Sequence, residues 1–255
     1  MRAVYTIARN TFREAIRDRI LYLFLGFAVL LIVSSKLFSM LTVGDETKII
    51  KDLGLGAIQF FSMLISVMMS VMLVSREVEN RTAFNILAKP VRRHSFILGK
   101  YFGLLAIIVA NLLLMTAALL VIIFLYQGEI DLTIFTGAGM TFLEMAVLCA
   151  FAVLFAMVTK PILGSVLTLA VFVVGHMTQG IWLLTERLQD AVTRFIVAVV
   201  YYVLPNLERF NFKSELVHSL PIPAAAVWWA ILYALIFTAL ALFLAWLKFR
   251  EKDLL

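Results

Sequence analysis

Long apolar stretches separated by short polar ones dominate the pattern along the chain. A helix needs about 20 mostly apolar residues to cross a hydrocarbon layer about 30 Å thick. Six stretches meet this requirement. Because backbone groups in lipid must be hydrogen-bonded internally, stretches of this length predict helices rather than barrel strands. The predicted spans are Ile20–Leu41, Leu53–Ser75, Tyr101–Tyr126, Leu132–Val158, Ile162–Leu184 and Ala224–Leu247.

One further apolar stretch is too short to span. Ala191–Leu204 carries Thr193 and Arg194 among otherwise apolar residues, and Pro205 ends it. It lies in the 39-residue segment 185–223 between the last two spans. We expect a re-entrant or interfacial helix on the outer face of the membrane, and a distorted span is the alternative.

Residues 1–19 form an amphipathic pattern before the first span. Arg9, Arg13 and Arg17 stand four residues apart on one side of the predicted helix. We therefore expect an interfacial elbow helix at the inner membrane surface, with its arginines near anionic lipid headgroups. The apolar side carries Val4, Ile7, Ala8, Thr11, Phe12, Ala15 and Ile16.

Composition narrows the class of protein. Hydrophobic residues make up 63% of the 255 residues and charged residues 15%, against about 25% charged in a soluble domain. This excludes a soluble enzyme, a disordered chain and a nucleic-acid-binding domain, because so much apolar surface could not be buried in water. The single cysteine, Cys149, excludes an intrachain disulfide.

The basic residues orient the chain rather than marking a nucleic-acid partner. Of the 22 Lys and Arg residues, 15 fall in the inner segments when the N-terminus is placed inside. This obeys the positive-inside rule and places both ends in the cytoplasm. We therefore predict an all-α membrane protein with one transmembrane domain over residues 1–255. The predicted inner segments are 1–19, 76–100, 159–161 and 248–255.

Polar residues share one face of the second predicted span. They stand three and four residues apart, as side chains on one helix face do. They could line a polar path or sit where helices pack closely, and we favour packing because serine is common at such contacts. The residues are Gln59, Ser62, Ser66 and Ser70.

Two further spans carry ionisable groups. Glu144, with Thr141 one turn earlier, should face the bundle interior and be paired or protonated, in either a functional or a structural role. His176 and Gln179 stand one turn apart in the fifth span and could contact substrate or a proton, although an interhelical hydrogen bond is the more ordinary use. Nothing in the spacing requires these groups to converge, so we do not expect an enzyme.

The inner loop 76–100 reads REVENRTAFNILAKPVRRHSFILGK. Arg76–Ala88 contains good helix formers, Lys89-Pro90 breaks the helix, and Arg92–Lys100 can restart it. Two short helices with a fixed elbow would form a lever that a separate motor protein could push. The alternative is a solvated loop whose basic residues set the topology, and composition alone favours that alternative.

The order of residues in this loop supports the first interpretation. Its pattern is E-x-E-x-R-T, then L-x-x-P-V-x-R, then F-x-x-G-K. It resembles the first cytoplasmic loop of ABC transporter permease subunits, in the six-span exporter-like branch that includes the permease of nitrous-oxide reductase maturation. Later segments are similar to the same family before its last span and at its C-terminal end. They are Leu204-Pro205-Asn206-Leu207, Phe210-Asn211, and Phe249-Arg250 with Asp253.

This resemblance implies a permease subunit without a motor of its own. Two permease chains, identical or homologous, would pair with two ATP-binding subunits that hold ATP and Mg. Together they would export a substrate across the cytoplasmic (inner) membrane of a bacterium or archaeon, surrounded by membrane lipids. The loop would contain the coupling helix, with Pro90 at its elbow. Candidate coupling residues are Arg76, Glu77, Glu79, Arg81, Thr82 and Arg93.

The sequence agrees that ATP binds elsewhere. No G-x-x-x-x-G-K-[ST] motif occurs, because His94 stands in place of its first glycine and Tyr101 follows Gly99-Lys100. Neither H-E-x-x-H nor a Cys/His cluster is present for a metal. We therefore expect no catalytic or metal site on this chain. The alternative function is a mechanical or scaffold subunit that acts on an outer-face protein partner through 185–223 without moving solute.

Overall fold

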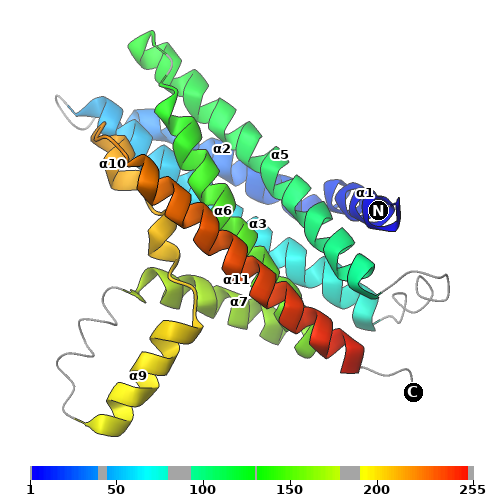
Figure 1. Ribbon diagram of the computed structural model, residues 1–255. Coiled ribbons are helices and arrows are strands. Elements are labelled where there is room, and N and C mark those ends of the chain that lie inside the picture. Colours follow the sequence, from blue (N-terminus) through cyan, green and yellow to red (C-terminus); the bar gives the residue numbers. More distant parts are fainter. Residues whose placement is uncertain (1, 40–44, 80–92, 130, 179–189, 252–255) are drawn as a thin grey trace.

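The computed structural model describes residues 2–39, 45–79, 93–129, 131–178 and 190–251, and within these ranges the regular secondary structure is entirely helical. Five helices are long and apolar enough to cross a membrane. They run side by side as one bundle (Figure 1). The prediction of an all-α membrane domain is confirmed to this extent. The five are α2 (Arg19–Ser39), α3 (Glu46–Glu79), α5 (Arg93–Gln127), α6 (Thr133–Val158) and α11 (Ala224–Glu251).

The fifth predicted span, Ile162–Leu184, differs from expectation. The helix here, α7 (Pro161–His176), has 16 residues and is about 24 Å long at 1.5 Å per residue, short of the apolar thickness of a bilayer. Pro161 begins it, and the Met177 N–H bonds back to the carbonyls of Val173 and Val174 where it ends. Residues 179–184 lie outside the described part of the chain, so five long spans are supported rather than six.

The short apolar stretch forms a helix, α9 (Ala191–Val203). Asp190 caps it, because its Oδ2 accepts hydrogen bonds from the Thr193 hydroxyl at 2.6 Å and the Thr193 N–H at 2.9 Å. These bonds lower the pKa of Asp190. In Figure 1, α9 stands apart from the bundle and runs across the direction of the long helices.

The chain then returns to the bundle through two short helices. They are η1 (Leu207–Phe210), which packs against α6 and α7, and α10 (Lys213–Val217), which lies beside the first turns of α3. Lys213 Nζ pairs with Asp52 Oδ1 at 3.0 Å. We call this the α10 end of the bundle. The opposite end, where α3 ends and α5 begins, is the loop end.

The N-terminal helix α1 (Arg2–Ile16) packs directly on the first turns of α5. A Cβ at Gly103 would lie 2.7 Å from the carbonyl oxygen of Ala8, and a Cβ at Gly99 would lie 2.7 Å from Ile7 Cβ. These two glycines stand four residues apart, the small-residue spacing that lets helix backbones approach closely. The apolar side of α1 therefore contacts protein.

The centre of the bundle is α6, which contacts α3, α5, α7 and α11. It is apolar on all sides, as expected for a helix surrounded by other helices. By contrast, α2 and α11 leave many large apolar side chains exposed, among them Phe27, Leu30, Trp228 and Phe243. Such exposed apolar faces fit contact with lipid.

Candidate functional site

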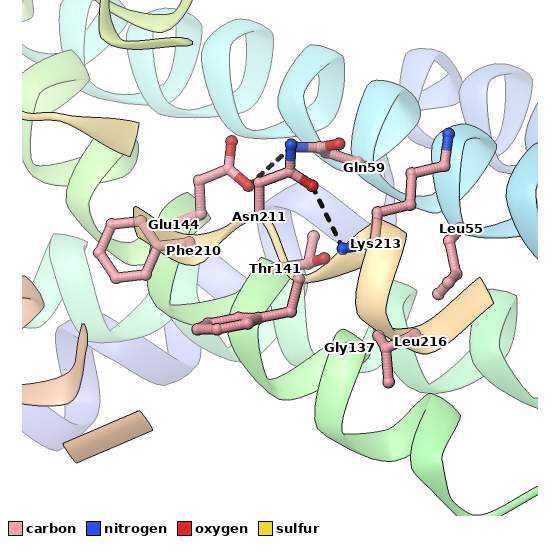
Figure 2. Close-up of a pocket in the computed structure, with 10 residues that line it drawn as sticks. Leu55, Gln59, Gly137, Thr141, Glu144, Phe210, Asn211, Lys213 and Leu216 are labelled. Atoms are coloured by element: carbon pink, nitrogen blue, oxygen red, sulfur yellow. Dashed lines mark hydrogen bonds between the residues drawn. The ribbon is translucent and has the colours of Figure 1, made fainter. Parts of the chain in front are cut away.

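The most buried acidic group among the described residues lies in the middle of α6. Glu144 is 1% exposed and is eleven residues, or about 16 Å, from the first residue of its helix. Its Oε2 accepts a hydrogen bond from Gln59 Nε2 of α3 at 3.0 Å (Figure 2). A carboxyl group at this depth needs a proton or a partner, and α3 supplies one hydrogen bond to it.

The second partner is His176, the last residue of α7. Its Nε2 lies 3.3 Å from Glu144 Oε1 and 3.1 Å from Gln59 Nε2. Its Nδ1 lies 3.0 Å from the Phe172 carbonyl oxygen, and the two rings pack with centroids 4.4 Å apart. Because a carbonyl only accepts, Nδ1 carries a hydrogen, and this fixes the tautomer of a neutral imidazole.

The proton positions in this cluster follow from its donors and acceptors. The Gln59 amide has two N–H groups, and one can donate to Glu144 while the other donates to His176 Nε2. The Nε2 lone pair of a neutral His176 then lies 3.3 Å from Glu144 Oε1, which has no hydrogen-bond partner among the described residues. A carboxylate oxygen beside that lone pair would be repelled, so the arrangement fits one proton carried by the pair of Glu144 and His176. We call Gln59, Glu144 and His176 the polar triad.

A small cavity reaches Glu144 from the α10 end (Figure 2). The space open to water is about 20 Å³, enough for about one water molecule. Where the cavity leaves the bundle, the Asn211 side chain accepts a hydrogen bond from the Lys213 N–H at 3.3 Å. Its lining comes from α3, α6, and the segment from η1 to α10, and includes Leu55, Gln59, Gly137, Thr141, Glu144, Phe210, Asn211 and Lys213.

The remaining polar residues of α3 lie between helices. Ser62, Ser66 and Ser70 are at most 2% exposed, and Ser70 Oγ lies 3.0 Å from Cys149 Sγ of α6. The Ser62 and Ser66 hydroxyls have no hydrogen-bond partner among the described residues. Their burial fits close helix packing, whereas Gln59 on the same face joins the polar triad.

The candidate coupling residues fall at the loop end. Arg76 is exposed near the end of α3, which continues through Glu77 and Glu79, and Arg93 begins α5. Three further candidates, Arg81, Thr82 and Pro90, lie in 80–92, outside the described residues. Gln179 of the predicted fifth span also lies outside the described residues.

Several members of the site were not identified as such from the sequence. The convergence of Glu144 and His176 was not expected, and Lys213 was not among the candidate site residues. Asn211 was noted for its resemblance to a family segment, which gave no sign that it borders a cavity. Among the described residues, no group of three His, Cys, Asp or Glu side chains could bind a metal ion.

Comparison with curated proteins gives no match. The sequence model of one protein family, described as a protein of unknown function (DUF2705), matches residues 49–255. The match includes all three members of the polar triad and the residues that line the cavity. Since it covers most of the chain, the chain belongs to the DUF2705 family.

Proposed function

We propose that this chain is the permease subunit of an ABC transporter, moving a substrate across the cytoplasmic membrane, by export, with ATP hydrolysed on a separate subunit. The observation that carries the proposal is the length of α3 and α5. With 34 and 35 residues they measure about 51 and 53 Å, well beyond the bilayer's apolar thickness. They run unbroken to Glu79 and from Arg93, on either side of the segment that resembles a coupling loop.

The packing supports movement of these helices as a unit. Because α1 is fitted against α5 at Gly99 and Gly103, a force on the loop end would act on α1 and α5 together. The long helix α3 contacts α2, α5, α6 and α7, and it carries Gln59 of the polar triad. A push on the loop could therefore change the packing in the middle of the bundle, as lever-driven transitions require.

The proposal includes partners. Two ATP-binding subunits would hold ATP and Mg beneath the loop end, and a second copy of this chain or a homologous chain would complete the pathway. The exposed apolar sides of α2 and α11 offer surface for that chain or for lipid. Both ends of the chain would then lie in the cytoplasm.

Co-purification tests the proposal. The chain is co-expressed with a candidate ATP-binding subunit, and the complex is isolated in detergent. We expect Glu77→Ala with Glu79→Ala to weaken the complex and to lower ATP hydrolysis that depends on the permease. Glu129→Ala is the control, because Glu129 is exposed at the opposite end of the bundle. A complex that forms equally well with both variants would contradict the proposed contact.

A second candidate function rests on α9. This helix stands apart from the bundle, and Val192 and Val203 expose their side chains. A mechanical subunit would use it to hold a protein partner on the outer face without moving solute. In that case, deletion of 191–204 abolishes the partner contact while ATP hydrolysis by the complex continues, and transport of solute is never observed.

A further inference from the structure

We infer that the polar triad of Gln59, Glu144 and His176 is a proton-binding site that exchanges its proton with water at the α10 end of the bundle. The ligand is a proton, delivered through the cavity that ends at Glu144. The inference is independent of the transport proposal, because it concerns only contacts within this chain.

The first argument is that Glu144 and His176 need one further proton between them, because Glu144 Oε1 is buried without a hydrogen-bond partner among the described residues. With Nδ1 of His176 bonded to the Phe172 carbonyl, that proton sits either on Glu144, while Gln59 donates to the Nε2 lone pair, or on Nε2, which then faces Glu144 Oε1 and gives up the Gln59 hydrogen bond. That proton makes the pair neutral overall, whether it sits on the carboxyl group or on the imidazole. Its loss would leave one uncompensated negative charge in an apolar interior, which is unfavourable.

The second argument is access. Glu144 is 1% exposed, yet the cavity that reaches it has room for about one water molecule and is bordered by Thr141 and Asn211. A water molecule placed there could carry a proton between the carboxyl group and the half-exposed end of the cavity at Lys213. A hydrogen bond that only stabilises packing needs no such opening.

None of the neighbouring positive charges on η1 and α10 pairs with Glu144 in place of a proton. On η1, Glu208 is near enough for its negative charge to act on Glu144, while Arg209 lies over the Tyr233 ring of α11, 4.8 Å from its centroid. On α10, Lys213 is 3.0 Å from Asp52 of α3, so its positive charge is already paired. On the α5 side of α6, Tyr101 donates a hydrogen bond to the Ala146 carbonyl.

The polar triad also lies next to another segment of the chain, so a change in its protonation could alter the packing of that segment. His176 is the last residue of α7, and a Cβ on the preceding Gly175 would lie 2.8 Å from the Pro205 carbonyl oxygen and 2.7 Å from Leu207 Cγ. The segment between α9 and η1 is therefore pressed against the end of α7. A change in the charge or position of His176 would therefore alter the packing of the segment between α9 and η1 against α7.

Infrared and NMR titrations of the full chain in lipid nanodiscs test the inference. A double variant, His94→Gln with His218→Gln, removes the two exposed histidines and leaves His176 as the single labelled imidazole. We expect a protonated carboxyl band that is lost in Glu144→Gln and kept in Glu129→Gln. We also expect the labelled nitrogen signals of His176 to change at the same pH as that band, because the two groups share one proton.

Access is tested by hydrogen–deuterium exchange of the same band. Thr141→Leu fills the cavity and should slow the exchange, whereas Thr141→Ser keeps a hydroxyl there and should leave it unchanged. Should Glu144→Gln fail to fold, the histidine signals of the double variant test the shared proton without altering the triad. A carboxyl band that survives Glu144→Gln, independent titration of His176, or equal exchange in Thr141→Leu and the parent chain would each overturn the inference.

Discussion

His176 Nε2 lies 3.3 Å from Glu144 Oε1, although the two residues come from different helices and a third, Gln59, comes from α3. This contact joins the end of α7 to the middle of α6. Since α6 is the central helix of the bundle, the polar triad joins three helices that also pack against one another, α3, α6 and α7.

Removal of the carboxyl group should destabilise the bundle. Glu144→Leu leaves one N–H of the Gln59 amide without its acceptor in an apolar interior, which costs about 1–3 kcal/mol. Glu144→Gln keeps hydrogen-bonding groups in place and should cost less. Thermal unfolding in detergent, followed by circular dichroism, measures the difference. Equal melting temperatures for Glu144→Leu and the parent chain, with assembly and transport unchanged, would show that the triad is dispensable.

The α1–α5 contact makes a separate prediction. At Gly103 an added methyl group would meet the Ala8 carbonyl, a backbone atom that cannot rotate away, so Gly103→Ala should destabilise the chain by about 1–3 kcal/mol. The control is Gly139→Ala in α6, where no atom lies within 4 Å of the added Cβ. There a helix former replaces glycine, and stability should stay equal or rise by about 0.5–1 kcal/mol.

Unfolding measurements on the two glycine variants distinguish these outcomes. Gly103→Ala should lower the melting temperature, whereas Gly139→Ala should not. If the two alanine variants behave alike, α1 does not depend on close approach to α5.

A third prediction concerns pH at the α10 end. Lys51, 7% exposed, pairs with Asp131 at 2.5 Å and so joins α3 to the segment before α6. Burial alone would raise the pKa of Asp131, but its hydrogen bonds from Lys51 and Thr133 outweigh burial and lower it below the ordinary 3.8. A lowered pKa in the folded state means that the pair stabilises the fold above pH 3.8 and that this contribution is lost as the pH falls further.

We therefore expect Asp131→Asn to lower the melting temperature at neutral pH. In strong acid, the melting temperatures of the variant and the parent chain should become equal. The matched control is Asp45→Asn. Asp45 also has a lowered pKa, through its hydrogen bond and charge pairing with Lys48, but both side chains are at least half exposed. An exposed pair contributes little, so this variant should hardly change the melting temperature. A difference in melting temperature between Asp131→Asn and the parent chain that stays the same at every pH would contradict a stabilising role for the Lys51–Asp131 ion pair.

Much of the fold could be predicted from hydropathy, because long apolar runs determine helices in lipid. The α9 helix and its stop before Pro205 followed from the same pattern. The early end of α7 could not be predicted, because the residues after His176 remain largely apolar and no proline follows there. Hydropathy measures the length of an apolar run and does not report where a helix inside it ends.

The site was harder to predict than the fold. Glu144 was a candidate because a carboxyl group in a span is rare, yet its partners depend on which helix faces meet, and a single sequence does not contain that information. The α1–α5 contact did leave a signal, since Gly99 and Gly103 have the spacing of a close helix contact. Of the pair, only Gly99 was interpreted, as part of the loop pattern.

The most direct test of the proposed function is photo-cross-linking in native membranes. A photoreactive amino acid is placed at position 81, in the loop, or at position 129, at the opposite end of the bundle. With the ATP-binding subunit co-expressed, we expect position 81 to form an adduct with that subunit and position 129 to form none. An adduct from position 129, or none from position 81 when the complex is assembled, would contradict the account.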